Sequence, residues 1–370
     1  MAQKNKGLLQ NPQGTEGIYL EEAFRHRQIV RAVNDLFTAW GYLPAQVPMY
    51  DFFDTYRDLI DNRTAETIYR LTDRDGDLLM LRSDVTLFLA KQVGSVLQKQ
   101  DLPLRICYAD SILRHQDRED ISRNEFFQVG AELIGDTGIR GDLEVLSLLA
   151  KLLSVLDLPE CYIHIGSRRL FDLITDRVKP PEKERIGSLI ATRDSAELKK
   201  ALSDLQIAGD PSGDPDFFAD LFLFIGNARE FKTVTSDVRV ESDIPGMKEA
   251  LDDTLSIFQV LKGMYPAQKL RIDLSEIGAQ SYYTGPVFQV YAEGSDRAVA
   301  SGGRYDDLLA HFGPPCPSIG FSMLLRKVEP LMKKTKTYSF PAADHINTEN
   351  FRDALEQAEK IRENGGIAIL

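Results

Sequence analysis

The order of apolar and polar residues predicts a chain built from amphipathic helices and pairs of strands. Residues 21–40 carry apolar side chains at helical spacing and end at Gly41, so we expect a helix that stops at this glycine. The next residues include Pro44 and Pro48, which exclude a helix and disfavour a central position in a sheet. We therefore expect an extended segment at a sheet edge or at an interface.

Strand pairs are expected in the next part of the chain. Residues 67–83 alternate around a turn, which is typical of a β-hairpin, and residues 84–98 have the spacing of a helix. Two further strand-like runs, residues 104–116 and 125–135, flank a polar loop at residues 117–124. Such neighbouring strands favour an antiparallel sheet.

The rest of the chain divides into a helical part and a second group of strands. Residues 141–158 predict a strongly apolar helix, and residues 167–268 are mainly helical, which we interpret as a helical insertion. Strands resume after residue 268, and the last stretch predicts a strand, a helix at residues 350–364 and a closing apolar run. Adjacent strands outnumber strand–helix units, so the fold class is α+β with a mostly antiparallel sheet flanked by helices.

The composition indicates a sizeable core and an acidic surface. Hydrophobic residues make up 43% of the 370 residues, and 44 Lys and Arg stand against 56 Asp and Glu, a net charge of −12. An exposed polyanion is therefore not favoured as a partner, because affinity for nucleic acid depends on clustered cations. The sequence has no apolar run long enough for a signal peptide or a membrane span, so no membrane association is expected.

The cysteines and histidines do not indicate a metal site. Cys107, Cys161 and Cys316 are odd in number, far apart and without a C-x-x-C pair, so neither a zinc site nor a disulfide framework is predicted. The sequence also lacks phosphate-loop, dinucleotide and H-E-x-x-H motifs, and a lone histidine such as His164 is expected to be structural. We expect a cytoplasmic protein without a metal or a cofactor.

The richest polar segment is the strand pair that ends at Gly135. It carries Arg114, Gln128 and Glu132, and the last two share one face because they lie four residues apart on one strand. One interpretation is a polar floor for a small zwitterion, with Arg114 toward an anion and the other two toward a cation or an imidazole. The other interpretation is a solvated sheet face with paired charges, which the spacing alone favours.

Two other segments allow both a structural and a functional interpretation. Asp84 and Thr86 stand at the start of an expected helix, so Asp84 either holds an α-amino group or caps this helix. Tyr282 and Tyr283 precede a strand, and alternation predicts that one ring lines a pocket while the other packs in the core.

The stretch SGGRYDD, residues 301–307, also has two interpretations. Gly302 and Gly303 turn the chain, with Asp306 or Asp307 capping the next helix. Alternatively, the glycines bring the backbone close to a ligand, and Arg304 and Tyr305 line its pocket. The residues alone favour the first interpretation.

Taken together and in order, these segments resemble the catalytic core of class II histidyl-tRNA synthetases. They resemble more closely a paralogous family, the regulatory subunits of ATP phosphoribosyltransferase. The likeness covers residues 12–330. GYLPAQVP is similar to the first class II motif at the dimer interface, RICYADSILRH and EFFQVGAELIG to the second, PSIGFSMLLRK to the third, and YYTGPVFQVY and SGGRYDDLLAHFG to two histidine-specific stretches.

This resemblance implies a fold and a set of binding residues. The fold is a class II synthetase-like antiparallel sheet in residues 1–330, with residues 331–370 similar to the start of an anticodon-binding α/β domain and too short for a whole one. In synthetases, the positions of Asp84, Thr86 and Gln128 hold the α-amino group, and those of Glu132 and Tyr283 read the imidazole, while Tyr305 reaches the ligand. With Arg114, these residues form the candidate histidine pocket.

The departures from the synthetase pattern imply that adenylation is lost. Gly278 occupies the place of an arginine that stabilises charge during adenylate formation, and Gln116 and Ser122 replace the glutamate and arginine that bind ATP. The loop between them carries three carboxylates, which repel a triphosphate. In synthetases the third motif ends in a glutamate-arginine pair. Here Arg326 and Lys327 stand near that place, shifted by one residue from the position of the arginine.

The resemblance therefore implies a regulatory subunit with no catalytic residues of its own. It is expected to act with a short-form catalytic subunit of ATP phosphoribosyltransferase, as a homodimer within a hetero-oligomer, with histidine as the effector and no tRNA. An active histidyl-tRNA synthetase, which would bind ATP and tRNA, is the alternative.

Overall fold

The computed structural model describes residues 11–12, 14–115, 124–204, 214–236, 244–333, 341–348 and 350–370. They form two compact units, one of residues 11–16 and 33–333 and the other of residues 17–32 and 341–370. The predicted first helix is α1 (Leu20–Ala39), and Gly41 follows it with a φ of +81°. No helix among the described residues is long and apolar enough to cross a membrane.

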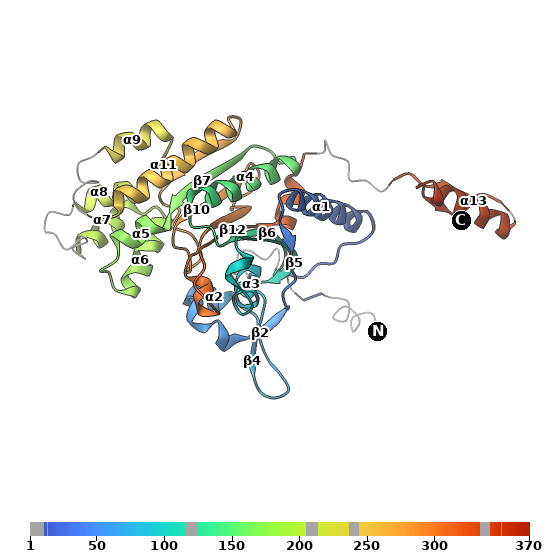
Figure 1. Ribbon diagram of the computed structural model, residues 1–370, viewed down its shortest axis with the longest axis horizontal. Helices are drawn as coiled ribbons and strands as arrows, with labels where there is room; N and C mark the ends of the chain where they lie inside the picture. The colour runs from blue at the N-terminus through green and yellow to red at the C-terminus, as the bar shows by residue number, and fades with distance from the viewer. Residues whose placement is uncertain are drawn as a thin grey trace, which may run out of the picture. The chain divides into compact units, whose positions relative to one another are not determined.

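The larger unit is built around a mixed sheet that is mostly antiparallel, as the sequence predicts (Figure 1). Pairs β1/β5 and β7/β9 are parallel, and the other described pairs in this sheet are antiparallel. In spatial order its nine described strands are β1 (Leu43–Pro44), β5 (Leu104–Leu113), β6 (Glu125–Ile134), β12 (Ser318–Leu324), β11 (Ala300–Arg304), β10 (Pro286–Ala292), β7 (Cys161–Ser167), β9 (Lys269–Asp273) and β8 (Ile225–Gly226).

Different helices pack against the two faces of this sheet. Helices α4 (Ile139–Val155) and α11 (Met247–Met264) contact each other, and they contact strands β6, β12, β7 and β9 between them. The apolar stripe of α4 is buried there, with Leu146, Leu149 and Leu152 at 0% exposure. Helix α3 (Val85–Gly94) contacts β5 and belongs to a separate apolar cluster, which also contains tyrosines from the other half of the sheet.

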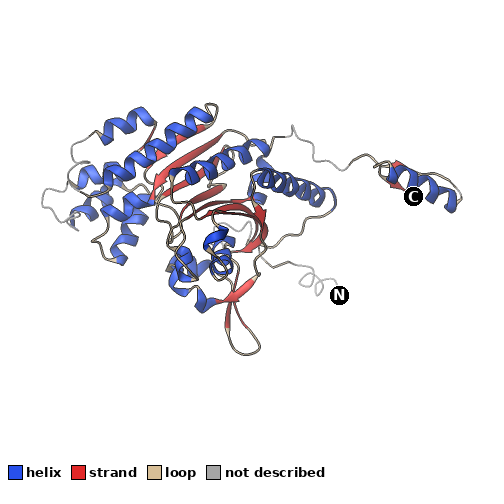
Figure 2. Ribbon diagram, viewed as in Figure 1, coloured by secondary structure: helices blue, strands red, loops and turns tan. Residues whose placement is uncertain are grey.

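A small second sheet extends from this unit and contains the predicted hairpin (Figure 2). Its order is β2 (Tyr50–Phe52), β4 (Leu78–Leu81) and β3 (Arg70–Thr72). The turn between β3 and β4 is closed by Asp73, whose carboxylate accepts hydrogen bonds from the backbone of Asp75 and Asp77. Helix α2 (Asn62–Thr67) precedes the hairpin.

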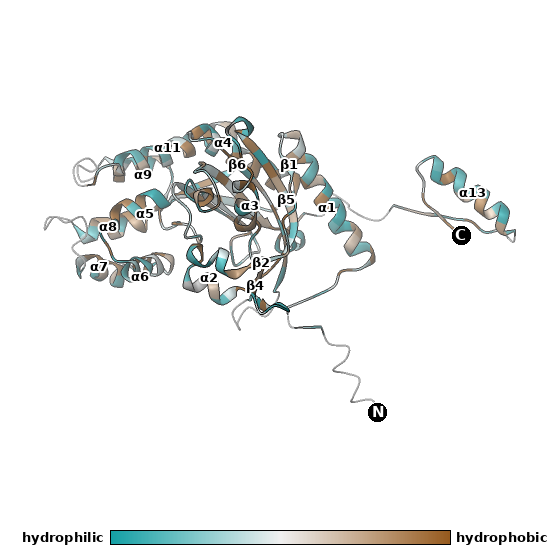
Figure 3. Cartoon of the chain, turned by 60° about the horizontal axis from the view of Figure 1, so that its bottom comes forward, coloured by the Kyte–Doolittle hydropathy of each residue, from teal (hydrophilic) through white to brown (hydrophobic). Residues whose placement is uncertain are grey.

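The predicted helical insertion lies between β7 and β9. Strand β8, which pairs with β9, also belongs to this stretch, so the insertion is not wholly helical. Residues 205–213 and 237–243 of this stretch lie outside the described residues. In Figure 3 the main strands are largely brown, the hydrophobic colour, and these helices carry teal, hydrophilic stretches. Before α11 the insertion contains α5 (Arg168–Ile174), α6 (Pro180–Ala191), α7 (Ser195–Asp204), α8 (Pro215–Phe222) and α9 (Ala228–Thr235).

The smaller unit contains the predicted strand, helix and closing strand. Helix α13 (Phe351–Glu363) begins after Asn350, whose side chain accepts a hydrogen bond from the amide of Arg352 at 3.0 Å. Strands β13 (Asp344–His345) and β14 (Ala368–Ile369) pair in parallel. The domain boundary at residue 330 and the likeness to an anticodon-binding domain stay predictions.

Candidate functional site

A cavity of about 160 Å³ opens beside α3 on the face of the sheet away from α4. Its walls come from the start of α3, from β6, from the turn before β10 and from β11 and β12. The structure brings all seven candidate residues together here: Asp84, Thr86, Arg114, Gln128, Glu132, Tyr283 and Tyr305.

Asp84 has the capping role, one of the two roles that the sequence allowed. One carboxylate oxygen caps α3, because it accepts a hydrogen bond from the amide of Thr86 at 2.9 Å. The other oxygen accepts hydrogen bonds at 3.1 Å from Arg114 and from the Gln128 amide. The capping interpretation is therefore confirmed, and the same carboxylate also joins Arg114 to Gln128 at the cavity wall.

Glu132 is the most unusual residue of the cavity. Its side chain is 1% exposed and accepts hydrogen bonds from the hydroxyls of Thr86 at 2.7 Å, Tyr305 at 2.5 Å and Tyr108 at 3.3 Å. Burial raises the pKa of Glu132 to about 7, against the lowering effect of these hydroxyls. No Lys, Arg or His among the described residues forms an ion pair with it, so a cationic group of a ligand would be favoured here.

Gly320 on β12 leaves the space that Glu132 occupies. A Cβ atom at Gly320 would lie 1.5 Å from a carboxylate oxygen of Glu132, which no side chain can accept. The two residues face each other in the antiparallel pair of β6 and β12. Gly320, in the third motif, therefore makes room for a pocket residue on the neighbouring strand. The spacing of residues along the sequence does not reveal this pairing.

Tyr282 and Tyr283 both line the cavity, so the prediction that one ring lies on each face is wrong. The two residues precede β10 in a turn, where the alternation of a strand does not apply. Their rings lie 5.3 Å apart between centroids, and that of Tyr282 lies 5.7 Å from Tyr305. Burial raises the pKa of both phenols, so they stay neutral, and neither hydroxyl has a hydrogen-bond partner among the described residues.

The first four residues of the stretch SGGRYDD belong to a strand rather than to a turn. Gly302 and Gly303 lie within β11, and Asp307 precedes a short 3₁₀ helix without a side-chain cap, so the favoured interpretation is wrong. A Cβ atom at Gly302 would lie 2.3 Å from the carbonyl oxygen of Gly320. At Gly303 it would lie 2.9 Å from the ring of Tyr283, so this glycine lets a pocket ring pack on the strand.

Tyr305 lines the cavity, in agreement with the second interpretation of this stretch, whereas Arg304 does not, so that interpretation is wrong for Arg304. The Arg304 guanidinium is buried and pairs with Asp142 of α4 at 2.7 Å, and it also donates to the carbonyl oxygen of Asp136. It therefore fastens β11 to α4 on the other face of the sheet. A buried arginine is costly without such a partner, which is why it turns away from the cavity.

Gly278, where a synthetase has its arginine, has backbone that only glycine adopts easily. Its φ is +81°, and a Cβ atom there would lie 2.5 Å from the Tyr283 ring. A side chain at this position would strain the loop and displace Tyr283. The pocket as it stands is therefore incompatible with an arginine here.

The other motif departures lie away from the cavity or outside the described residues. Gln116 and Ser122, with the acidic residues between them, fall in the undescribed stretch 116–123. Arg326 does not line the cavity; one of its guanidinium nitrogens donates to the carbonyl oxygen of Glu16 at 3.4 Å.

Sequence reasoning missed several residues of the site. Tyr108 donates to Glu132 from β5, and Gln280, Ser301 and Ser322 line the cavity. Tyr108 could have been found from register, because it pairs with Gly130, which lies between Gln128 and Glu132 on the pocket face. No local pattern in the sequence marks Ser301 and Ser322 as pocket residues.

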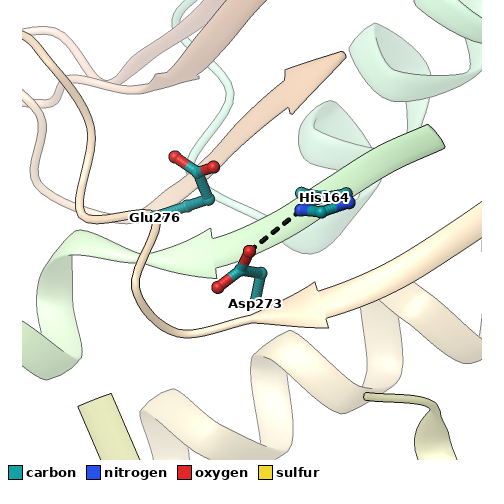
Figure 4. Close-up of side chains that lie close together, drawn as sticks. All are labelled: His164, Asp273 and Glu276. Atoms are coloured by element: carbon teal, nitrogen blue, oxygen red, sulfur yellow. Dashed lines mark hydrogen bonds and ion pairs between the residues drawn. The ribbon is translucent and has the colours of Figure 1, made fainter. Parts of the chain in front are cut away.

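A second polar cluster lies at the far end of the sheet and includes His164 (Figure 4). Ligand atoms of His164, Asp273 and Glu276 lie within 4.8 Å of one another, a spacing that a metal ion could use. However, the Arg193 guanidinium donates to both oxygens of Asp273, at 3.0 and 2.9 Å, and His164 contacts the same carboxylate at 2.9 Å. Hydrogen bonds from His164 and Ser275 and the charge of Arg193 hold the pKa of Asp273 low despite its burial, as in an ion pair.

Comparison with known proteins identifies the family. The family model described as histidyl-tRNA synthetase matches residues 14–328. The ATP phosphoribosyltransferase regulatory subunit of Bacillus pumilus is 30% identical over 347 residues, which are 93% of this chain and 86% of that protein. The chain belongs to the family of ATP phosphoribosyltransferase regulatory subunits. The regulatory subunit of Moorella thermoacetica is 28% identical over 364 residues, 98% of this chain and 92% of that protein.

Solved structures of the family share the fold. A protein from Bacillus halodurans described as an ATP phosphoribosyltransferase regulatory subunit/histidyl-tRNA synthetase has a TM-score of 0.83 at 24% identity, over 98% of this chain and 92% of that one. A chain of the ATP phosphoribosyltransferase complex from Thermotoga maritima has a TM-score of 0.56 at 22% identity, over 80% of this chain and 96% of that one. The predicted class II synthetase-like fold is confirmed.

Proposed function

We propose that this chain is a non-catalytic regulatory subunit of ATP phosphoribosyltransferase. It acts with a short-form catalytic subunit in the first step of histidine biosynthesis and relays feedback inhibition by histidine, which binds in the cavity described above. The observation that carries the proposal is Glu132, a buried carboxylate with hydroxyl partners and no cation, in a pocket that lacks the synthetase arginine.

The imidazole, α-amino and α-carboxylate groups of histidine complement the polar groups of this cavity. Its imidazole has an ordinary pKa of about 6.5, so near neutral pH it can give a proton or a strong hydrogen bond to Glu132. Tyr283 offers a free hydroxyl to the second ring nitrogen. The α-amino group would be held near Asp84, Gln128 and the hydroxyl oxygen of Thr86, and the α-carboxylate near Arg114.

The charges of the cavity support sensing rather than activation. Arg114 is the only cationic side chain among the described residues that line it, and it is already paired with Asp84 at 3.1 Å. ATP would bring a triphosphate that needs several cations or metal ions. Removing one preorganised charge-stabilising group typically costs about 10²–10³ in rate, so the arginine missing at Gly278 counts strongly against adenylation.

The partner and the oligomer are further parts of the proposal. A chain of the Thermotoga maritima transferase complex has this fold, which supports assembly with a catalytic subunit. A homodimer through the first motif is supported by Leu43, whose side chain is 66% exposed on edge strand β1, and by an apolar groove beside Val47, Val93 and Val96. A cytoplasmic location is supported by three buried cysteines that form no disulfide.

The deciding experiment mixes the purified chain with a short-form catalytic subunit and assays transferase activity with and without histidine. We expect activity only from the mixture and inhibition by histidine. Glu132→Gln should weaken that inhibition, whereas Glu293→Gln, a change at an exposed glutamate, should not. Histidine-dependent exchange of pyrophosphate into ATP by the chain alone would overturn the proposal in favour of a synthetase.

A further inference from the structure

We propose that Arg193 is a positioning residue for the pocket, through which the helical insertion controls the loop of residues 274–285. This inference rests on the proposed function, because it assigns to that pocket a mechanical link to a distant part of the chain. Arg193 follows α6 and does not touch the cavity.

The link begins at Asp273, the last residue of β9. Its carboxylate is 1% exposed and accepts hydrogen bonds from Arg193 at 3.0 and 2.9 Å, while the same Arg193 nitrogen donates to the Ser275 hydroxyl at 2.8 Å. Ser275 in turn donates to Asp273 through its amide at 3.1 Å and its hydroxyl at 2.6 Å. The Arg193 guanidinium therefore binds the residues at which strand β9 ends and the loop begins.

A second contact between the helix and the loop lies next to the first. A Cβ atom at Gly187 of α6 would lie 3.3 Å from the end of the Ile277 side chain, so the helix packs directly on the loop. Between the two contacts, Glu276 accepts a hydrogen bond from the Tyr291 hydroxyl of β10 at 2.6 Å. The loop is thus held from α6 on one side and from the sheet on the other.

The loop then enters the pocket. Gly278 lies against the ring of Tyr283, because its φ is +81° and a Cβ atom added there would lie 2.5 Å from that ring. Gln280, Tyr282 and Tyr283 follow and line the cavity. A displacement of the turn after α6 would therefore move the start of the segment that carries two pocket tyrosines.

Arg193 itself is held in an uncommon backbone conformation. Its φ is +55°, in the left-handed region that residues with a side chain rarely adopt. Its side chain is 43% exposed, yet it reaches a buried carboxylate. This conformation belongs to the end of α6, where the amides of Arg193 and Asp194 donate to the carbonyl oxygens of Ile190 and Leu189, so the helix end sets where the Arg193 side chain begins.

The test uses Arg193→Ala and Arg193→Lys in the full chain assembled with its catalytic subunit. The matched control is Arg185→Ala, because Arg185 lies on α6, the helix that Arg193 follows, and pairs with Glu182 and Glu197 inside the insertion. Two quantities are measured: the Kd of histidine by calorimetry, and hydrogen exchange of residues 274–285 without ligand. Circular dichroism verifies that each variant is folded.

We expect Arg193→Ala to raise the Kd of histidine by roughly 2- to 30-fold and to speed exchange in residues 274–285. Arg193→Lys, which keeps the charge but not the planar guanidinium, should recover part of both effects. Arg185→Ala should change neither. Unchanged exchange and an unchanged Kd in Arg193→Ala would overturn the inference.

The two proposals fail in different ways. If Glu132→Gln weakens histidine binding and Arg193→Ala has no effect on either quantity, the pocket is the effector site and the link is wrong. If Glu132→Gln leaves histidine binding unchanged, the effector site lies elsewhere. Exchange of residues 274–285 in Arg193→Ala then decides alone whether Arg193 positions the loop.

Discussion

At the scale of single residues, Glu132 connects stability to pH. Burial raises its pKa from 4.5 to about 7, so the folded state holds the proton more tightly than the unfolded chain. The stabilisation is fully present below pH 4.5 and is lost as the pH rises through 7. We expect Glu132→Gln to remove this decline in the free energy of unfolding, as measured by urea unfolding at about pH 5 and about pH 8. A decline of equal size in the variant would contradict the assignment.

Tyr283 and Tyr305 allow a paired prediction. The Tyr283 hydroxyl has no hydrogen-bond partner among the described residues, whereas that of Tyr305 donates to Glu132 at 2.5 Å. Tyr283→Phe should therefore weaken histidine binding by about 2- to 10-fold, the worth of one hydrogen bond, and leave the melting temperature unchanged. Tyr305→Phe should lower both the affinity and the melting temperature. Calorimetry and thermal unfolding of the two variants measure this contrast; a drop in melting temperature for Tyr283→Phe would refute it.

The pocket residues were predictable from the sequence to different degrees. Gln128 and Glu132 share a face because strand alternation is strictly local, and the structure confirms it. Arg114 and Asp84 meet through long-range packing, and their meeting could be anticipated only from the resemblance to a family. Tyr282 could not be placed by strand alternation, because it lies in the turn before β10 and not in a strand.

At the scale of elements, the loop of residues 274–285 depends on Gly278. Alanine at this position would place a Cβ atom 2.5 Å from the Tyr283 ring, in backbone with a φ of +81°. We expect Gly278→Ala to lower the free energy of unfolding by about 1–2 kcal/mol and to weaken histidine binding, because Tyr283 must move. Gly263→Ala is the matched control, since nothing lies within 4 Å of a Cβ atom there. Equal behaviour of the two variants in denaturant unfolding and calorimetry would contradict the structural account.

The elements also show where local signals mislead. A Gly-Gly pair usually marks a turn, but Gly302 and Gly303 lie inside β11 because neighbouring strands and rings occupy the space of their side chains. One interpretation placed Arg304 beside a ligand, but its partner Asp142 lies on α4, far away in the chain. The helices and the hairpin, whose hydrophobic periods are local, were predicted correctly.

At the scale of the whole molecule, the chain combines a synthetase-like fold with a pocket in which Arg114 is the only cationic side chain among the described lining residues. The sheet, the start of α3 and the tyrosines form the cavity that we propose as the histidine site. The insertion between β7 and β9 contacts the loop that closes this cavity. Such a molecule can relay an effector only if it binds the effector with different affinity in two states, either free and assembled or two states of the assembled complex.

Thermodynamic linkage makes this statement testable without an activity assay. If histidine distinguishes the free chain from the complex with the catalytic subunit, the Kd of histidine differs between them by a factor that corresponds to about 1–3 kcal/mol. The same factor must then appear in the Kd of the two subunits measured with and without saturating histidine. Calorimetry gives the first ratio and analytical ultracentrifugation the second. We expect the two ratios to agree and both to approach one in Glu132→Gln. Two ratios of one in the native protein would show that histidine binding is not coupled to assembly, and inhibition would then have to act within the assembled complex.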